Sequence, residues 1–475
     1  MNYRHIKVFN LKMLLLTIVA AMSCEVLDKD PIGDFSSELA FSSPERIELS
    51  AVGMYDVLQH EEFLGGRALI YADIRGEDTN VPSYFGDVAR FNLLADNGTI
   101  LNAWTGAYAT INTANLFLEG MEANKDKITP EKAEHYEGEA LFIRALTHFY
   151  LVNLFAQPYN FTPDASHLGV PVRTFATSGE NITDSQNEVP RSTVKQVYDQ
   201  IIEDLKAAAE KLPASYGDSF SNVARATSGA AHALLSRVYL YTMNYPDAIA
   251  QADLVIAGDY DLNDHPLTAF TDFMTQESIF SVAHNQSDNP NTNHALGQHY
   301  GVTNRKDIFV DAFAEIPGLN ADDLRLTEMT TEDEGHLYTL KFTDRADWAP
   351  ILRYAEVLLN KAEALVKRDE EISQEAIDLL NEVRDRSQVS AASYEATDFA
   401  SYEELLETIL TERRIELAFE GHRLFDLLRN KKGVPAQPLD NVPAQAWGSD
   451  YVIFPIPQEE MLANPALAGQ QNKGY

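Results

Sequence analysis

Most of this chain of 475 residues shows the apolar spacing of amphipathic helices, and that spacing limits it to a mainly helical fold. The clearest case lies at residues 226–256, which we predict to form two helices joined at residues 244–246. Small alanine side chains recur on the faces that would meet, as in tetratricopeptide helical hairpins. Residues 351–386 repeat this pattern with less regular spacing. Because such hairpins bury their apolar faces only against neighbours, we expect degenerate repeats inside one globular body.

Four further segments have the helical period and are predicted to be long helices. Pro44 and Pro130 begin two of them, since proline is favoured in the first helical turn. Trp104 lies at an apolar position of another, so we assign it to the core. The four segments are residues 44–58, 100–121, 130–155 and 192–212.

Three long irregular stretches separate these helices, at residues 64–98, 157–190 and 284–347. They are rich in Gly, Asp, Asn, Pro and Thr, which favour turns and loops. Loops of this length inside a compact domain are usually functional or disordered. Their regularly spaced aromatic residues argue against disorder, so we expect ligand contacts in these stretches.

The densest charge pattern lies at residues 412–429, with the sequence ERRIELAFEGHRLFDLLR. Its opposite charges lie three residues apart, a spacing at which side chains on one helix can pair. The pattern alone therefore predicts an amphipathic surface helix with ion pairs. The predicted pairs are Arg413 with Glu416, Glu420 with Arg423, and Arg423 with Asp426.

The exact string at residues 412–429 also resembles the C-terminal signature helix of the SusD/RagB family, bacterial outer-membrane lipoproteins that capture nutrients, usually glycans, for a transporter. Other segments resemble the family in the same order and spacing, so the resemblance covers nearly the whole mature chain. These segments are Trp104-x3-Tyr108-x2-Ile111-x3-Asn115, residues 139–145, residues 352–359, and the closing stretch from Phe454-Pro-Ile-Pro to Gly474-Tyr475. In the closing stretch, Pro-Ile-Pro must be extended and a short helix can start near Glu459.

The resemblance implies an all-α, SusD-like fold, in which degenerate tetratricopeptide-type hairpins pack with a loop-rich ligand-binding lobe. It divides the mature chain into an N-terminal SusD-like region with helical repeats, residues 24–260, and a C-terminal SusD/RagB region, residues 261–475. The repeat side is expected to dock on a SusC-like TonB-dependent outer-membrane transporter. The loop side is expected to bind an oligosaccharide or polysaccharide and to act as a lid over that transporter.

The N-terminus predicts export and lipid anchoring on independent grounds. Three basic residues precede an uncharged apolar run at residues 13–22, which is too short to span a membrane and fits a signal peptide at residues 1–23. Cys24 follows directly and is the only cysteine, so it cannot form an internal disulfide. We expect Cys24 to carry lipid that anchors the protein to the outer membrane, facing outwards. The alternative is an ordinary signal peptide followed by a chance cysteine.

The charge balance limits the possible partners. The chain has 72 acidic and 37 basic residues, a formal net charge of −35. Such a protein repels phosphate backbones, so nucleic acid is an unsuitable partner. A neutral ligand suits it better.

A sugar binder needs aromatic plates for flat C–H faces and polar side chains for hydroxyl groups. Residues 71–91 and the long third loop carry this mixture. Phe85 and Phe91 could equally pin their loop to the body, whereas Arg144, Arg353 and Arg414 are interpreted as structural. The predicted ligand-binding residues are Asp73, Arg75, Asp78, Tyr84, Phe85, Arg90, Phe91, His299, Tyr300 and Trp348.

No motif in the sequence predicts catalysis. It contains no G-x-S-x-G elbow, no H-E-x-x-H, no P-loop and no dinucleotide fingerprint. With so many acidic residues, any pair of carboxylates is weak evidence for a glycosidase. We therefore expect a binding protein without cofactor or metal. A peptide-binding member of the same family, a surface glycosidase and a structural scaffold remain the alternatives.

Overall fold

The computed structural model describes residues 37–179, 181–437 and 440–475. The predicted signal peptide and Cys24 lie outside the described residues. Within these ranges the protein is mainly helical, which confirms the predicted fold class. None of the helices in this part of the chain is both long and apolar enough to cross a membrane.

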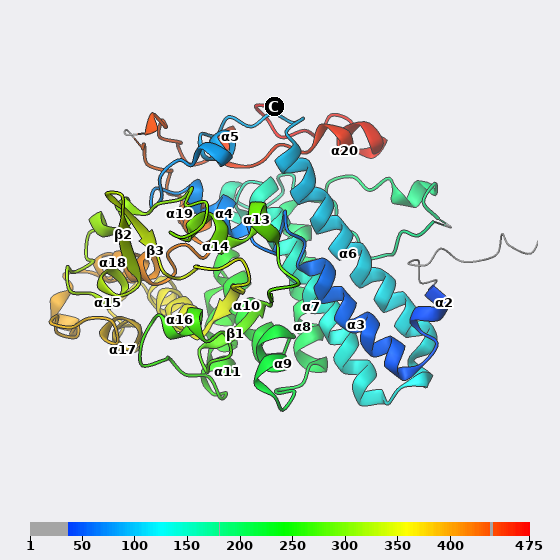
Figure 1. Ribbon diagram of the computed structural model, residues 1–475, viewed down its shortest axis with the longest axis horizontal. Helices are drawn as coiled ribbons and strands as arrows, with labels where there is room; N and C mark the ends of the chain where they lie inside the picture. Colours follow the sequence, from blue (N-terminus) through cyan, green and yellow to red (C-terminus); the bar gives the residue numbers. More distant parts are fainter. Residues whose placement is uncertain (1–36, 180, 438–439) are drawn as a thin grey trace, which may run out of the picture.

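Long helices form the body of the molecule (Figure 1). Those predicted at residues 44–58 and 130–155 have the predicted limits, and the others begin or end a few residues away. In chain order the long helices are α3 (Pro44–Leu58), α6 (Gly98–Asn124), α7 (Pro130–Phe155), α8 (Val194–Lys211), α10 (Ser228–Tyr241), α11 (Tyr245–Ile256), α16 (Tyr354–Asp369), α17 (Gln374–Asp385) and α18 (Tyr402–Glu416).

Local capping explains where several of these helices begin. Thr193 and Gln196 form a capping box at α8: the Thr193 hydroxyl accepts from the Gln196 amide at 3.2 Å, and the Gln196 side chain accepts from the Thr193 amide at 2.9 Å. Thr129 caps α7 ahead of Pro130, and Thr227 caps α10. The short connection between α10 and α11 makes them an antiparallel hairpin, as predicted.

The helices pack in succession, α6 on α7, α7 on α8, α8 on α10 and α10 on α11. Helix α11 then packs on α16, which joins the two halves of the sequence, and α16 packs on α17 and α18. One continuous apolar core runs from Phe41 to Leu467. Residues on both sides of position 260 contribute to this core, and the division predicted there stays a prediction.

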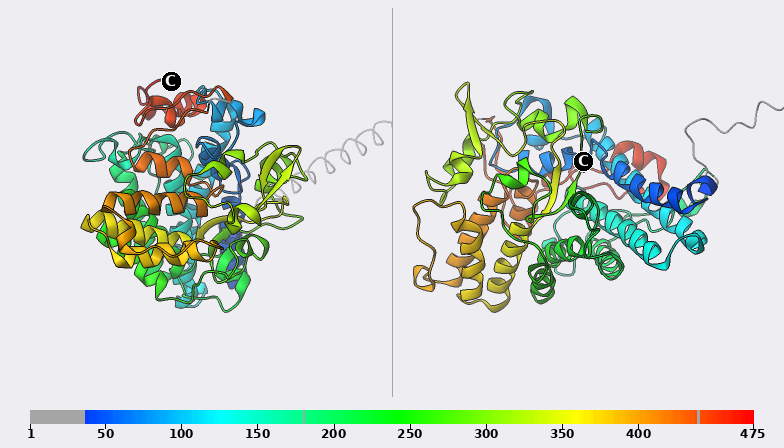
Figure 2. Two further views of the ribbon diagram at one scale, coloured as in Figure 1. Left: turned by 90° about the vertical axis from the view of Figure 1, so that its left-hand side faces the viewer. Right: turned by 60° about the horizontal axis from the view of Figure 1, so that its bottom comes forward.

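The first and third irregular stretches meet through Asn80 and Phe309, whereas the second lies against α6. In the left view of Figure 2, the yellow-green segment of the third stretch extends from the side opposite α16, α17 and α18. It contains more regular structure than predicted. Its helices are α13 (Asn291–His294), α14 (Leu296–Tyr300) and α15 (Leu324–Thr327), and its hairpin is β2 (Thr330–Asp333) with β3 (His336–Thr339).

A second small sheet corrects one helix boundary. Residues 351–353 were predicted to begin a helix, but they belong to β4 (Ala349–Arg353), which pairs antiparallel with β1 (Ser278–Val282). Both strands are buried along their whole length. A short apolar run has the same composition in a buried strand and in a buried helix, so periodicity alone could not separate the two.

The single surface helix predicted at residues 412–429 is wrong. Helix α18 ends at Glu416 and α19 (Arg423–Arg429) begins after a break in which Phe419 and Gly421 have φ of 68° and 80°. Gly421 also approaches Leu69 so closely that a Cβ there would lie 2.8 Å from the Leu69 Cα. Glycine meets both demands, because it tolerates positive φ and has no side chain.

The charged residues of this run are buried except Arg414 and Arg423, which are partly exposed, and none of its three predicted pairs forms an ion pair among the described residues. Arg413 instead contacts Asp426, with 2.7 Å between Nε and Oδ2. Glu420 accepts from Arg353 and Lys341, each at 2.7 Å. Residues 412–429 therefore form ion pairs in the interior of the protein rather than a solvent-exposed helix face.

The end of the chain returns to the N-terminal helices. The Phe454 amide donates to the Leu154 carbonyl at 2.8 Å, and the Gln458 amide to the Ala95 carbonyl at 2.8 Å. After this extended segment comes the short helix α20 (Gln458–Ala463), as predicted, which lies beside α6 in Figure 1.

Candidate functional site

Two loop segments far apart in sequence meet at one edge of the molecule. The first joins α4 (Arg67–Ile74) to α5 (Gly86–Ala89), and the second follows α14. Asn80 fastens them together: its amide donates to the Phe309 carbonyl at 3.0 Å, and its side-chain oxygen accepts from the Phe309 amide at 2.8 Å. In Figure 1, α4, α5, α13 and α14 accordingly lie in the same upper part of the molecule.

Tyr84 presents an aromatic ring at this edge. Its residue is 43% exposed, and its hydroxyl accepts from Arg67 Nη2 at 2.8 Å. The guanidinium of Arg305 lies 4.3 Å from the centre of the ring. His299 and Phe85 pack beside the ring, with centroids 5.4 and 4.8 Å away. The ring is therefore both exposed and held in place before any ligand arrives.

Paired charged and polar side chains next to Tyr84 hold its surroundings in place. Glu62 forms an ion pair with Arg67 and accepts from His294 Nε2 at 3.0 Å. Burial alone would raise the pKa of Glu62, but the His294 hydrogen bond and the Arg67 charge outweigh burial and lower it. His299 bonds to the Asp307 carboxylate at 2.9 Å through Nδ1. These bonds fix Arg67 and the second loop relative to Tyr84.

A cavity of about 400 Å³ lies beside the same two loops. One wall is the stacked pair of Phe309 and His336, whose ring centroids are 3.9 Å apart at an angle of 24°. Asp311 holds His336 in place by accepting from its Nδ1 at 2.8 Å. Thr79 and Gln437 also line the cavity, and each has a buried side-chain oxygen without a hydrogen-bond partner in the described structure.

This arrangement suits a ligand with flat apolar faces and several hydroxyl groups. Tyr84, Phe309 and His336 offer rings, whereas Arg305 and Asp440 offer a donor and an acceptor near them. The described residues contain no group of three His, Cys, Asp or Glu side chains placed to hold a metal ion.

Of the ten residues predicted to bind ligand, the structure places only Tyr84 and Arg90 at the surface. The other eight are buried, at most 7% exposed, and cannot reach a ligand from where they lie. These eight are Asp73, Arg75, Asp78, Phe85, Phe91, His299, Tyr300 and Trp348.

The polar members of this group act inside the fold. Asp73 accepts from the Tyr300 hydroxyl and from the Gly421 amide, both at 3.0 Å, and burial raises its pKa well above the usual range. Asp78 pairs with Arg414, 2.9 Å from its Nε. These contacts attach the first loop to the signature run.

The three remaining predictions, Arg75, Phe91 and Trp348, also lie in the interior. Arg75 lies between the rings of Phe91 and Phe454, 4.7 and 4.8 Å from their centres, and burial lowers its pKa to about 10. Trp348 stacks on Phe273, with centroids 5.4 Å apart, in a small separate cluster. Trp348 is therefore not part of the Tyr84 edge.

Sequence reasoning missed Arg67, Arg305, Phe309 and His336. Arg305 and Phe309 lie in the third irregular stretch, where ligand contacts were predicted, but the residues chosen there were His299, Tyr300 and Trp348. His336 becomes recognisable only once β3 places it against Phe309, so its sequence position gives no signal.

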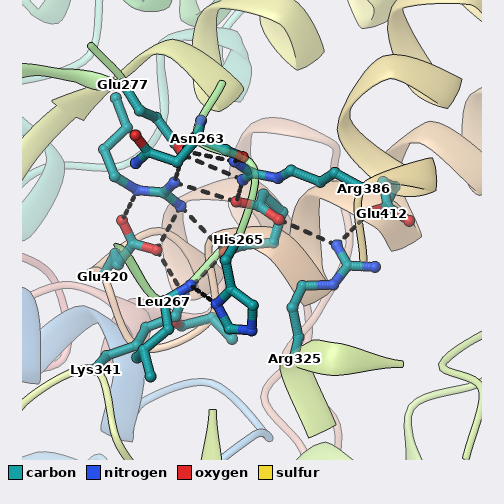
Figure 3. A network of polar contacts seen from close by, with 12 residues as sticks. Asn263, His265, Leu267, Glu277, Arg325, Lys341, Arg386, Glu412 and Glu420 are labelled. Atoms are coloured by element: carbon teal, nitrogen blue, oxygen red, sulfur yellow. Dashed lines mark hydrogen bonds and ion pairs between the residues drawn. The ribbon is translucent and has the colours of Figure 1, made fainter. Parts of the chain in front are cut away.

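A dense cluster of charged side chains lies in the interior of the described chain. It joins the residue before β1, strand β4 and the run at residues 412–429 (Figure 3). Arg386 Nη1 contacts Glu277 at 2.6 Å, and Lys341 contacts Glu420 at 2.7 Å. Glu416 is buried at its centre; its pKa is lowered because the charges of Arg386 and Arg353 outweigh the effect of burial. All these side chains are less than 10% exposed, so the cluster is structural and open to no substrate.

Two comparisons concern the sequence. Residues 25–240 match the SusD-like family described as starch-binding and associating with the outer membrane, and residues 326–475 match the SusD family. A SusD-like protein of Formosa agariphila is 27% identical, over 97% of this chain and 98% of its own length.

Solved structures show the same similarity in three dimensions. A SusD superfamily protein of Bacteroides fragilis is 30% identical and matches with a TM-score of 0.80, covering 90% of this chain and 99% of that one. A candidate sugar-binding protein of Bacteroides vulgatus is 28% identical, with a TM-score of 0.79 over 91% of this chain and 99% of that one.

Proposed function

This chain belongs to the SusD family, and from that premise we propose that it is an outer-membrane lipoprotein that binds an oligosaccharide or polysaccharide at the cell surface. It would deliver this ligand to a SusC-like TonB-dependent transporter. The observation that carries the proposal is the exposed, fixed ring of Tyr84, which lies on the same pair of loops that borders the cavity walled by Phe309 and His336.

Lipid anchoring rests on the sequence. Cys24 directly follows the apolar run of the predicted signal peptide and would carry the lipid. The family that matches residues 25–240 is described as associating with the outer membrane, which supports the same location. The anchor would hold the protein at the membrane surface, where it can meet a transporter.

The ligand class follows from the surroundings of the aromatic rings. Asp311 and Asp440 flank the cavity, and the whole chain carries a net charge of −35, so an anionic ligand is disfavoured. Acceptors on the cavity rim, such as the Asp440 carboxylate, match hydroxyl donors. The similarity to a candidate sugar-binding protein agrees with a neutral glycan.

A peptide is the second candidate. Arg305 is 31% exposed and, with the acidic rim of the cavity, could bind the charged ends or side chains of a peptide as well as a sugar. A glycosidase is less well supported, because carboxylates as deeply buried as Glu416 and Glu420 are already bound in ion pairs.

Calorimetry of the protein lacking residues 1–24, against a panel of neutral polysaccharides and peptide digests, tests the proposal. We expect saturable binding of a glycan that weakens at least about tenfold in Tyr84→Ala and in Phe309→Ala. Phe161→Ala is the matched control, because Phe161 is an exposed aromatic residue (37%) outside both loops. Binding to peptides alone, or glycan binding that neither loop variant alters, would refute the proposed ligand or the proposed site.

A further inference from the structure

A second cavity, of about 460 Å³, lies near the opposite end of the molecule. It is bounded by α9 (Ser219–Ala224), the first turn of α10, the end of α11 and the loop that precedes β1. In Figure 1 these helices lie at the bottom, whereas α4, α5 and α14 lie above the centre. The cavity therefore shares no residue with the Tyr84 edge or with the cavity beside Phe309.

The ring of Tyr260 forms one wall of this cavity and is fixed by two contacts. Its hydroxyl lies 3.3 Å from the Thr227 hydroxyl, at hydrogen-bond distance. Gly229 lies so close that a Cβ there would be 2.3 Å from the tyrosine oxygen. The glycine thus lets the ring lie against the first turn of α10, and any larger residue at 229 would displace it.

Several polar groups around the ring make no hydrogen bond within the described part of the chain. They are the side chains of Ser228, Asp259 and Gln276 and the amide nitrogen of Asn222. The oxygen of Asn222 is already occupied, because it accepts from the Tyr216 amide at 2.7 Å and from the Ser215 hydroxyl. The orientation of Asn222 is therefore fixed with its NH₂ group as the free end. The cavity thus presents an ordered donor, free acceptors and an aromatic face together.

We propose that this cavity is a second binding site, which takes a neutral sugar of one or two rings. Its volume is within the roughly 300–1,000 Å³ of ligand pockets. The lining contains no Lys or Arg, one histidine, His232, and a single carboxylate, Asp259, so it offers no permanent positive charge to a sulfate or a uronate. A polyol can use the donor and the acceptors at once while its C–H face packs on Tyr260.

The test uses cellobiose, maltose and xylobiose as probes and saturation-transfer NMR as the readout. The protein carries Tyr84→Ala and Phe309→Ala, so that binding at the loop edge does not contribute. We expect at least one disaccharide to bind this protein saturably. Adding Ser228→Trp, which places a large side chain in the cavity, should weaken that binding at least about tenfold.

Gln276→Ala is a second variant that leaves the fold intact, because Gln276 is exposed and its side chain makes no described hydrogen bond. It should weaken the same binding several-fold while the melting temperature stays unchanged. Two results would overturn the proposal: no probe binds the folded double variant, or the bound probe is indifferent to both Ser228→Trp and Gln276→Ala. Neither result bears on the loop site, because that site is already disabled in this protein.

Discussion

At the scale of single residues, Arg353 shows how this protein tolerates so much buried charge. It is 2% exposed and contacts Glu420 Oε2 at 2.7 Å and Glu416 Oε1 at 3.1 Å, and it also pairs with Glu277. Taking an arginine and a carboxylate out of water is costly unless each is fully paired and hydrogen-bonded. Without Arg353 these carboxylates would keep other cationic partners, such as Arg386 at Glu277 and Lys341 at Glu420, but the buried cluster would lose one positive charge.

Replacing Arg353 by methionine should lower the free energy of unfolding by about 3–5 kcal/mol, because three buried carboxylates lose a shared partner. Lys195→Met is the matched control: Lys195 also pairs with an acid, Asp199, but both side chains are more than half exposed. The control should unfold like the parent. Equal stabilities of the two variants in urea would contradict a structural role for the cluster.

His284 makes the stability of the protein depend on pH. Burial lowers the pKa of its imidazole from 6.5 to about 4. Between pH 6.5 and 4, His284 is therefore protonated in the unfolded chain but not in the folded chain. The free energy of unfolding falls as the pH drops through this range. For this histidine alone the loss reaches about 2 kcal/mol at pH 5.

Urea unfolding of the parent and of His284→Gln between pH 7 and 5 measures this contribution. The variant keeps the backbone carbonyl that accepts from Trp348 Nε1, so the nearby packing is preserved. The parent should lose about 2 kcal/mol more than the variant across this range. Parallel pH profiles would mean that His284 takes up its proton equally in the folded and unfolded protein.

Residue types alone identified some structural charges but not the ligand-facing ones. Arg144 and Arg353 were predicted to be structural, and both form buried ion pairs, Arg144 with Asp204 at 2.6 Å. Asp78 was instead assigned to ligand because it lies in a loop. Its partner Arg414 lies 336 positions along the chain, and no local pattern connects the two.

At the scale of elements, periodicity predicted the long helices well and the breaks poorly. Capping residues and prolines are local signals, and α3 and α7 begin where these signals predict. The break between α18 and α19 depends instead on Leu69 in α4, which the chain order does not place near Gly421. The buried strands β1 and β4 were not predicted for a similar reason, because their pairing depends on tertiary contacts between distant segments.

Two glycines with nearly the same backbone allow the break after α18 to be tested. Gly421 and Gly217 have φ of 80° and 84°, but a Cβ would meet Leu69 at Gly421 and open space at Gly217. Gly217→Ala should cost about 1 kcal/mol from backbone strain alone. Gly421→Ala should cost at least about 2 kcal/mol more, because the added methyl group also overpacks the core. Similar losses in chemical denaturation would show that the approach of Leu69 is unimportant.

At the scale of the whole molecule, the helical body forms one core that supports the loop edge. Helices α11 and α16 pack across the middle of the sequence, and β1 pairs with β4 over a long intervening segment. The end of the chain also returns: Asn472 donates to the carbonyls of Phe155 and Phe454 at 2.7 and 2.6 Å. Unfolding of one part of this core would therefore expose apolar surface of the parts packed against it.

The described protein should therefore unfold in a single cooperative step. Scanning calorimetry should give equal calorimetric and van't Hoff enthalpies, and fluorescence and far-UV circular dichroism should report the same midpoint. Two separate transitions would instead indicate that residues 24–260 and 261–475 fold as independent domains.

The central claim is that the loop edge around Tyr84 and Phe309 binds a glycan. The most direct measurement is a crystal structure of the protein with the saccharide that binds most tightly in calorimetry. We expect a sugar ring packed on Tyr84 or on the Phe309–His336 pair, with hydroxyl groups bonded to Arg305 or to polar residues that line the cavity. A sugar bound elsewhere with this edge empty, even in the cavity beside Tyr260, would contradict it.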